Sequence, residues 1–293
     1  MKTAFSFKPC KRHIAGFTMG EMVIVIAIIA ILAALIAPLA VNIISQKRVD
    51  ACRQELKNIK IAIAGDPSLI EGGTRSSFGF VGDLGTLPVS LDELLRRFQT
   101  PGDTVTRLAY PQDPGFGWYW GWRGPYITDV AVSTGVISDP WGNGYNYVLN
   151  PVSNIAARIW SNGNNMTNDS GTGAVIGGDD ISIDIRMDEV FSQVSGNTFD
   201  KDFVQQRFNG IVDVGFTDPI RLDFPNGTAV VQAALNSSYT NTAYPPIYQF
   251  NVNIPIGIRS IRFRPTITAT TNSVLLVHIN NGPMTTMNLV NPN

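Results

Sequence analysis

The stretch from Met22 to Gln46 contains no charged residue, and this constrains the chain more than any other feature of its sequence. A helix of that length can cross the hydrocarbon core of a bilayer, which needs about 20 apolar residues. One acid, Glu21, interrupts the start of the apolar run, and a short basic segment ending at Ala15–Gly16 precedes it. In a secretory signal peptide, the small residues at the cleavage site follow the apolar segment. Here they precede it, so cleavage would leave an apolar helix on the mature chain.

The residues around this point are Gly16, Phe17 and Thr18, followed by Glu21. This pattern resembles the prepilin leader of the superfamily of type IV pilins and type II secretion pseudopilins. The resemblance implies that a prepilin peptidase cuts between Gly16 and Phe17 and methylates the new amine of Phe17. It also implies that Glu21 meets the N-terminus of an adjacent subunit in a filament. Pro38 matches a helix-interior proline of the family, where a kink or local melting of the helix is expected.

The basic residues of the leader predict that the leader stays in the cytoplasm and that the C-terminal part lies outside. We therefore expect a single-pass protein of the bacterial inner membrane that later enters a periplasmic or cell-surface filament. The resemblance implies several partners: further copies of the chain in a helical homopolymer, the prepilin peptidase, an inner-membrane assembly platform with its ATPase, and minor pilins or pseudopilins.

Beyond the apolar run, the sequence pattern becomes that of an amphipathic helix. Its apolar residues recur at intervals of three and four, at Val49, Cys52, Leu56, Ile59 and Ile63. Such spacing places these side chains on one face of a helix. Gly65–Asp66–Pro67 then provides a stop. We predict one helix over residues 17–64, with a transmembrane part at about 22–44 and a second half packed under a globular domain.

Two motifs in the following region are structural in character. Trp122–Ile127 resembles the W-x-G-P-Y element of major pseudopilins, and Asp139–Tyr147 resembles their D-P-W-G-x-x-Y-x-Y hairpin. The resemblance implies a small antiparallel sheet. Nearer the helix, Ser90 and Glu93 have the spacing of a capping box at a helix start.

A polar loop follows, and it resembles the stretch where major pseudopilins bind calcium. Oxygen donors on a glycine-flexed loop are the ligands that calcium prefers. The resemblance implies Asn165, Asp169 and Asp179 as candidate ligands of Ca²⁺, with Asn165 standing where the family has an acid. The alternative is an ordinary polar loop closed by its own hydrogen bonds.

From about residue 211 onward, the sequence consists of short alternating runs separated by Pro, Gly and Asn. About seven such runs predict a β-sandwich. The predicted domains are a leader (1–16), the N-terminal helix (17–64), a pseudopilin-like globular domain (65–190) and a β-sandwich-like domain (191–293). The predicted fold class is α+β: a long N-terminal helix with a transmembrane first half, packed on a small antiparallel sheet and followed by an all-β sandwich.

The sequence as a whole predicts a structural filament subunit of a type IV pilus or a type II secretion pseudopilus. The alternative is a filament-displayed binding or adhesion module, or a minor pilin, whose C-terminal β domain recognises a surface or cargo. No G-x-S-x-G, phosphate-binding glycine loop or H-E-x-x-H motif occurs, so we do not expect an enzyme.

The charge balance argues against nucleic acid as a partner. The chain has a formal net charge of −1, and its leader contributes four basic residues, Lys2, Lys8, Lys11 and Arg12. Subtracting these four charges leaves about −5 on the mature chain. A nucleic-acid-binding domain normally shows a basic stripe instead.

Overall fold

The computed structural model describes residues 16–96, 121–128, 136–199, 211–215, 230–233, 247–249, 254–264, 273–279, 285–286 and 289–290. It divides the chain into two compact units, Met1–Lys47 and Arg48–Asn293. The helix α1 spans Met19–Ala64, 46 residues, and so contributes to both units. Within α1, the side chains of residues 35–41 lie outside the described part of the chain, and Pro38 is among them.

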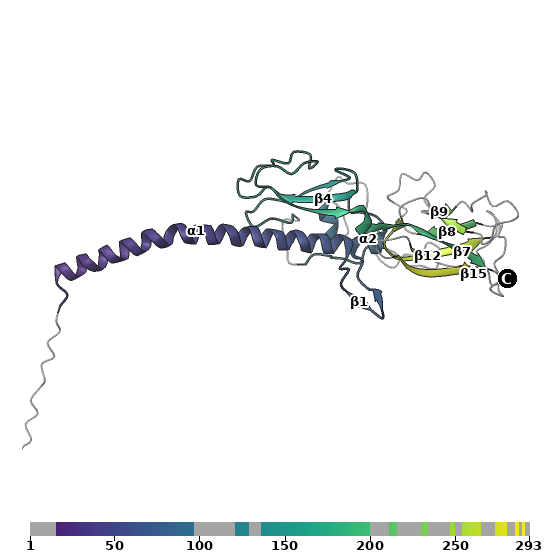
Figure 1. Cartoon of the computed structure of the whole chain (residues 1–293), viewed down its shortest axis with the longest axis horizontal. Helices are drawn as coiled ribbons and strands as arrows, with labels where there is room; N and C mark the ends of the chain where they lie inside the picture. Colours follow the sequence, from purple (N-terminus) through teal and green to yellow (C-terminus); the bar gives the residue numbers. More distant parts are fainter. Residues whose placement is uncertain are drawn as a thin grey trace, which may run out of the picture. The chain divides into compact units, whose positions relative to one another are not determined.

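In the first unit, α1 runs as a continuous helix (Figure 1). Every residue from Gly16 to Ala34 is exposed, including large apolar ones such as Val23, Ile26 and Ile31. Leucine and alanine favour a helix, and the long run of these and of isoleucine explains why the backbone forms one here. The side chains themselves find no cover within this unit.

The predicted transmembrane segment at about 22–44 is wrong. Among the residues that the structure describes, no helix is both long enough and apolar enough to cross a membrane. The predicted single-pass location in the inner membrane is wrong with it.

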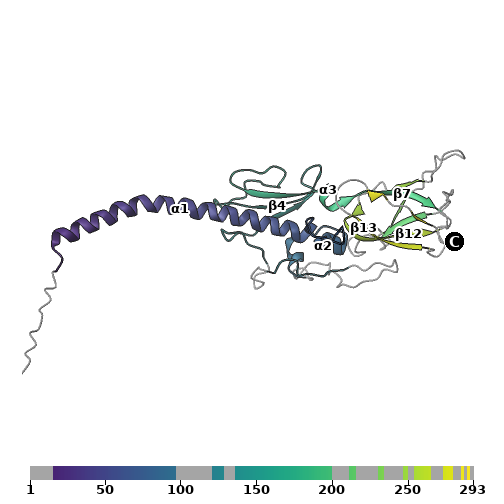
Figure 2. The same cartoon turned by 60° about the horizontal axis from the view of Figure 1, so that its bottom comes forward.

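The second unit contains the end of α1 and all other described elements (Figure 1 and Figure 2). The short helices are α2 Gly79–Leu84, the 3₁₀-helix η1 Leu91–Leu94 and α3 Met187–Val190. The first strands are β1 Ile70–Glu71, β2 Thr74–Arg75, β3 Asn146–Leu149, β4 Ile155–Ser161, β5 Ile181–Arg186, β6 Phe191–Ser192 and β7 Val194–Phe199. The later strands are β8 Ile211–Gly215, β9 Val230–Ala233, β10 Ile247–Gln249, β11 Ile254–Pro255, β12 Gly257–Arg264, β13 Ser273–Ile279, β14 Thr285–Thr286 and β15 Leu289–Val290.

The core of the second unit forms where the end of α1 meets the sheet β3-β4-β5. Four side chains on one face of α1 are at most 2% exposed: Cys52, Leu56, Ile59 and Ile63. They belong to one hydrophobic cluster with Ala157 and Ile159 of β4 and Ile185 of β5. The Lys60 ammonium adds a polar link, because it donates to the carbonyl oxygen of Asp184 at 2.9 Å and pairs with Glu189 at 2.7 Å.

The turn before β3 is organised by a single buried carboxylate. Asp139 Oδ1 accepts hydrogen bonds from the backbone N–H groups of Trp141 (3.0 Å) and Asn143 (2.8 Å). Its Oδ2 accepts from the Ser161 hydroxyl at 2.5 Å, which connects the turn to the end of β4. The predicted capping box at Ser90 and Glu93 is wrong, since the Ser90 side chain makes no capping hydrogen bond and the short helix after it is a 3₁₀-helix.

The remaining strands form small separate sheets, and this contradicts the predicted all-β sandwich. One sheet has the order β13-β12-β8-β9 and another the order β10-β7-β14, with β15 also paired to β7. The β14–β7 and β15–β7 pairs are parallel. A hairpin-connected antiparallel sandwich would not contain parallel pairs, which need long crossover connections. The predicted fold class is therefore wrong on two points: the transmembrane first half of the N-terminal helix and the C-terminal β-sandwich.

One guanidinium attaches the C-terminal strands to α2. Arg259 is fully buried, and it donates hydrogen bonds to five backbone carbonyl groups, those of Val81, Gly82, Pro255, Ile256 and Ile258. The backbones meet closely at this point, because a Cβ on Gly257 (φ +119°) would lie 2.9 Å from the Cα of Gly82. Burial lowers the pKa of Arg259 to about 9, so the side chain stays charged at neutral pH.

Replacing this guanidinium should destabilise the second unit. In Arg259→Met, carbonyl groups of α2 and β12 lose buried donors, and we expect a loss of about 2–4 kcal/mol in the free energy of unfolding. Urea unfolding of the full chain measures this loss. Arg186→Gln is the matched control, because Arg186 and its partner Asp188 are both 62% exposed. An unchanged urea midpoint for Arg259→Met would contradict the role of the guanidinium.

Candidate functional site

The predicted processing residues lie in the first unit, directly before helix α1. Gly16 and Phe17 are exposed and precede α1, and Phe17 is 81% exposed. A Cβ added to Gly16 would meet no atom within 4 Å. A protein that acts on this peptide bond would therefore find its backbone accessible from all sides.

Glu21 is engaged within its own chain, by the residue that starts α1. Its Oε2 atom accepts hydrogen bonds from the Thr18 backbone N–H (2.8 Å) and the Thr18 hydroxyl (2.9 Å). In return, the Glu21 N–H donates to Thr18 Oγ1 at 3.2 Å. This reciprocal arrangement is a capping box, and it satisfies N–H groups that the first turn of a helix leaves without partners.

The capping box also fixes the charge state of Glu21. The hydrogen bonds from the Thr18 backbone and then from its side chain lower the pKa of the Glu21 carboxyl below its ordinary value. The carboxylate lies in the first turn of α1, where the helix dipole favours a negative charge. Sequence reasoning assigned Glu21 to contact with another subunit; in the single chain, the structure places it on Thr18.

Three aspartates form an acidic cluster in the loop between β4 and β5, residues 162–180. Asp169, Asp179 and Asp180 each offer one carboxylate oxygen, and these oxygens lie within 4.8 Å of one another. The hydrogen bonds that hold the three carboxylates all reach their Oδ2 atoms. The donors are Asn165 Nδ2 for Asp169, the N–H groups of Asn164 and Asn165 for Asp179, and the N–H and hydroxyl of Ser170 for Asp180.

Asp180 is the unusual member of this acidic cluster. Its side chain is only 9% exposed, and its Oδ1 atom is buried without any hydrogen-bond partner in the described structure. A buried carboxylate oxygen without a partner costs free energy, and native proteins rarely leave one so. A cation bound at this oxygen would supply the missing partner. Sequence reasoning missed Asp180, although its place directly after Asp179 was a usable signal.

Asn165 supports the acidic cluster as a hydrogen-bond donor. Its Nδ2 donates to Asp169 at 2.8 Å, and its backbone N–H donates to Asp179 at 3.0 Å. Its side-chain oxygen, the atom that could bind a cation, accepts from the Thr167 N–H at 2.7 Å. Of the three predicted ligands, Asp169 and Asp179 lie in the cluster, and the Asn165 oxygen already accepts one hydrogen bond.

Glycines allow the loop to close tightly around the acids. A Cβ on Gly178 (φ +55°) would lie 1.8 Å from Asp169 Oδ2, and one on Gly163 (φ +65°) would lie 2.4 Å from the carbonyl oxygen of Asp179. Side chains at these two positions would push the carboxylates apart. The loop is thus built so that three like charges stay close together.

The donor set fits calcium. Three carboxylate oxygens with nearby carbonyl groups are hard ligands of the kind that Ca²⁺ prefers, and Ca²⁺ takes six to eight oxygens in flexible geometry. Backbone carbonyls and water would have to supply about half of that number. Bound Ca²⁺ would neutralise charge and link the middle of the loop, at Asp169, to its C-terminal end.

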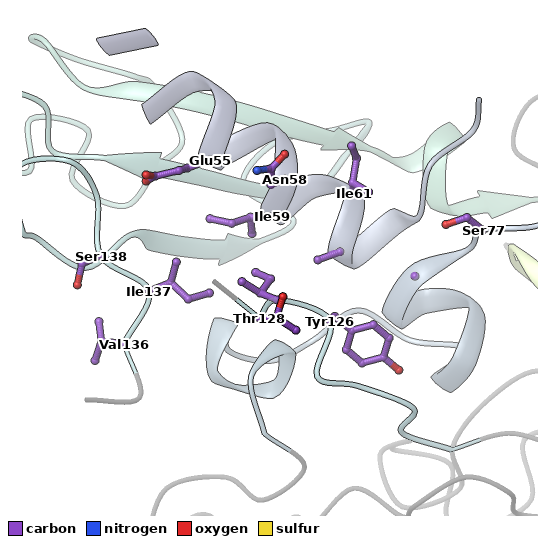
Figure 3. A pocket seen from close by; sticks show the side chains of 13 residues that line it. Glu55, Asn58, Ile59, Ile61, Ser77, Tyr126, Thr128, Val136, Ile137 and Ser138 are labelled. Atoms are coloured by element: carbon purple, nitrogen blue, oxygen red, sulfur yellow. The ribbon is translucent and has the colours of Figure 1, made fainter. Parts of the chain in front are cut away.

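The second unit also contains a cavity of about 770 Å³ beside α1. Figure 3 shows Glu55, Asn58 and Ile59 of α1 on one wall and Tyr126 and Thr128 on the other. The Glu55 carboxylate accepts a hydrogen bond from the Tyr145 hydroxyl at 2.7 Å and is thus already engaged. The lining ends at Thr128 and resumes at Val136, on either side of residues outside the described part, so we assign no ligand to this cavity.

Comparison with known proteins adds little to this geometry. No family model and no curated protein matches the chain. One solved structure, described as "The Bacillus anthracis TIE protein", matches with 15% sequence identity and a TM-score of 0.24. The match covers 38% of this chain and 18% of that one, and a likeness this low supports no inference about fold or function. The resemblance to pilins and pseudopilins thus stays a prediction.

The capping box predicts how Glu21 titrates. NMR of the full chain with isotope-labelled glutamate should show a Glu21 pKa below its ordinary value of 4.5. Since the folded pKa is lowered, the carboxylate stabilises the start of α1 above pH 4.5, and this contribution is lost as the pH falls through the folded pKa.

Two variants at Thr18 test the cause of this shift. Thr18→Val removes the hydroxyl and should raise the Glu21 pKa toward 4.5, whereas Thr18→Ser keeps the hydroxyl and should leave the pKa low. An unchanged pKa in Thr18→Val would show that the hydroxyl contributes nothing.

Proposed function

We propose that this chain is the structural subunit of a filament of the type IV pilus or type II secretion pseudopilus kind. The observation that carries the proposal is the exposed apolar part of α1 between Met19 and Ala34. An apolar surface of this extent is unfavourable in water, and in soluble proteins it marks an interaction site. The proposed cover is the same segment of other copies of the chain.

Self-association fits the shape and composition of this segment. A helix that is apolar on all sides suits the centre of a bundle, where every face meets another helix. Copies of one chain, related by a helical operator, make heterologous contacts that do not close into a ring, and such contacts generate filaments. Isoleucine, valine and leucine dominate the segment, and these residues supply most of the free energy of burial, about 1.5–3 kcal/mol for each fully buried side chain.

Processing after Gly16 would make the segment competent for assembly. A prepilin peptidase would remove the basic leader and create an α-amine on Phe17, next to the capping box. A carboxylate on Glu21 and an amine on a neighbouring copy form an ion pair, which would set the register between two apolar helices. The proposed partners are thus other copies of the chain, the prepilin peptidase, an assembly platform with its ATPase, and minor subunits.

Protein produced with and without a prepilin peptidase tests this proposal. With the peptidase, intact mass and N-terminal sequencing should give a chain that begins at methylated Phe17, and electron microscopy of sheared material should show filaments. Glu21→Ala should lower the yield of filaments at least ~10-fold, because register between neighbours is lost. Asp50→Asn is the matched control, since Asp50 lies in an exposed pair with Arg53 and should assemble normally.

Two outcomes would contradict the filament proposal. A chain that keeps its first 16 residues in the presence of active peptidase would show that it is not a substrate of the peptidase. Processed protein that stays monomeric at every concentration tested would show that the chain does not self-associate. The alternative, a binding or adhesion module displayed by the C-terminal strands, would then become the leading hypothesis.

A second candidate function is calcium binding by the acidic cluster, favoured by the buried and unpartnered Oδ1 atom of Asp180. We propose Asp169, Asp179 and Asp180 as the protein carboxylates that bind the ion. The ion would stabilise the folded second unit, since a ligand that binds only the folded state adds about 2.7 kcal/mol at 100 times its dissociation constant.

Thermal unfolding of the full chain in EDTA and in calcium tests this binding. We expect calcium to raise the Tm of the wild-type chain. Asp180→Asn should lose this response, while its Tm in EDTA should be equal to or above that of wild type, because a buried negative charge is removed. Asp188→Asn, an exposed acid outside the loop, should respond like wild type. A wild-type Tm that calcium leaves unchanged would contradict the site.

A further inference from the structure

The loop between β4 and β5 carries the acidic cluster and is called the acidic loop below. Arg158 of β4 connects it to the sheet β3-β4-β5. Its Nε and Nη2 atoms donate to the two carboxylate oxygens of Asp184 on β5, at 2.6 and 2.9 Å. Its remaining terminal nitrogen, Nη1, donates to the carbonyl oxygens of Gly173 (2.8 Å) and Ala174 (3.0 Å) in the loop. Arg158 is 8% exposed and lies directly opposite Asp184 in the β4–β5 register. The guanidinium thus bridges a rigid strand pair and a segment of the loop.

Trp160, two residues further along β4, holds the same part of the loop. Its indole N–H donates to Asn168 Oδ1 at 3.2 Å. A Cβ on Gly173 (φ +78°) would lie 2.7 Å from the indole ring, so the loop backbone rests directly on it. Arg158 and Trp160 therefore fix the loop at two points, near Asn168 and at Gly173.

Ser170 lies between these two points and holds Asp180. Its N–H and hydroxyl both donate to Asp180 Oδ2, at 2.8 and 2.5 Å. The Gly173 N–H donates to the Ser170 carbonyl oxygen at 2.9 Å and closes a turn over residues 170–173. This turn links Ser170 to Gly173, whose carbonyl oxygen accepts from Arg158. A chain of direct contacts thus runs from Arg158 through Gly173 and Ser170 to Asp180. That carboxylate is the one whose Oδ1 atom lacks a partner.

We propose that Arg158 is the positioning residue of the cation site, and that it sets the affinity of the acidic cluster for calcium without touching the ion. The inference rests on the calcium site proposed above. Without a cation, three neighbouring carboxylates repel one another and favour an open loop. The guanidinium holds the 170–174 segment on the sheet, so Asp180 keeps its orientation and calcium binds without first having to order the loop.

The geometry requires arginine at this position. A planar guanidinium can donate in two directions at once, here to a carboxylate and to two carbonyl oxygens. A lysine ammonium at the same place is a point charge that can pair with Asp184 but cannot also span to Gly173 and Ala174. Residues that orient metal ligands typically change metal affinity by about 10–100-fold when they are replaced.

Isothermal titration of the full chain with calcium chloride tests the inference, with the free energy of unfolding in EDTA measured in parallel. Arg158→Lys should weaken calcium binding about 10–100-fold. Asp184→Asn, which leaves the loop contacts but loosens the other end of the bridge, should weaken it in the same direction by a smaller factor. Arg186→Lys, on an exposed pair in the same sheet, is the matched control and should bind like wild type.

The outcomes separate this inference from the calcium site itself. If wild type binds no calcium, the proposed site fails. If wild type binds and both Arg158→Lys and Asp184→Asn bind equally well, the site stands and the positioning role is wrong. A loss of stability in EDTA with unchanged calcium affinity would show a merely structural role. If Arg158→Lys does not fold, the affinity of Asp184→Asn decides the question.

Discussion

The buried stripe of α1 is the contact on which the second unit depends. Cys52, Leu56, Ile59 and Ile63 lie at most 2% exposed, and they share one cluster with side chains of α2, β4 and β5. Each leucine or isoleucine buried in this way contributes about 1.5–3 kcal/mol, which is large beside the 5–15 kcal/mol of a whole domain. The polar contacts follow from this packing: the Lys60 ammonium can reach Asp184 and Glu189 only because the helix lies on the sheet. The acidic loop is in turn held by the same strands, so its geometry depends on the helix as well.

The first unit presents the opposite situation, since an equally apolar helix has nothing packed on its described side chains. The capping box of Thr18 and Glu21 stabilises the start of the helix without hiding any apolar surface. The capping box also engages the Glu21 carboxylate, with which the N-terminal amine of a neighbouring copy would pair. Assembly through Glu21 therefore has to exchange two intramolecular hydrogen bonds for an ion pair. In a bundle of helices the ion pair would lie away from water, where desolvation offsets much of its attraction, so the burial of the apolar side chains would supply the net driving force.

Local patterns were predictable from the sequence, whereas partners distant along the chain were not. The spacing of three and four in α1 indicated its buried stripe, because a helical period directly determines which residues share a face. The spacing S/T-x-x-E occurs at Thr18–Glu21 and again at Ser90–Glu93, and the prediction chose Ser90–Glu93 as a capping box. The structure forms it at the first, since the segment after Ser90 is a 3₁₀-helix and Glu93 reaches the N–H of Val89 instead. The prediction of a β-sandwich was wrong because the alternation of apolar and polar residues predicts strands but not their pairing. Nothing in the local sequence indicated that β7 pairs in parallel with β14.

The acidic loop shows how far residue types alone can assign the roles of side chains in a candidate site. Residue types correctly pointed to a cluster of oxygen donors, but the role of each donor depends on what the loop has already engaged. Asn165 has the chemistry of a ligand, yet its side-chain oxygen accepts from Thr167 and its nitrogen donates to Asp169. Asp180 directly precedes β5, and its Oδ2 atom accepts hydrogen bonds from the N–H and the hydroxyl of Ser170. The remaining oxygen, Oδ1, then has no partner in the described chain. A cation bound at Oδ1 would recover part of the free energy that this oxygen loses on burial.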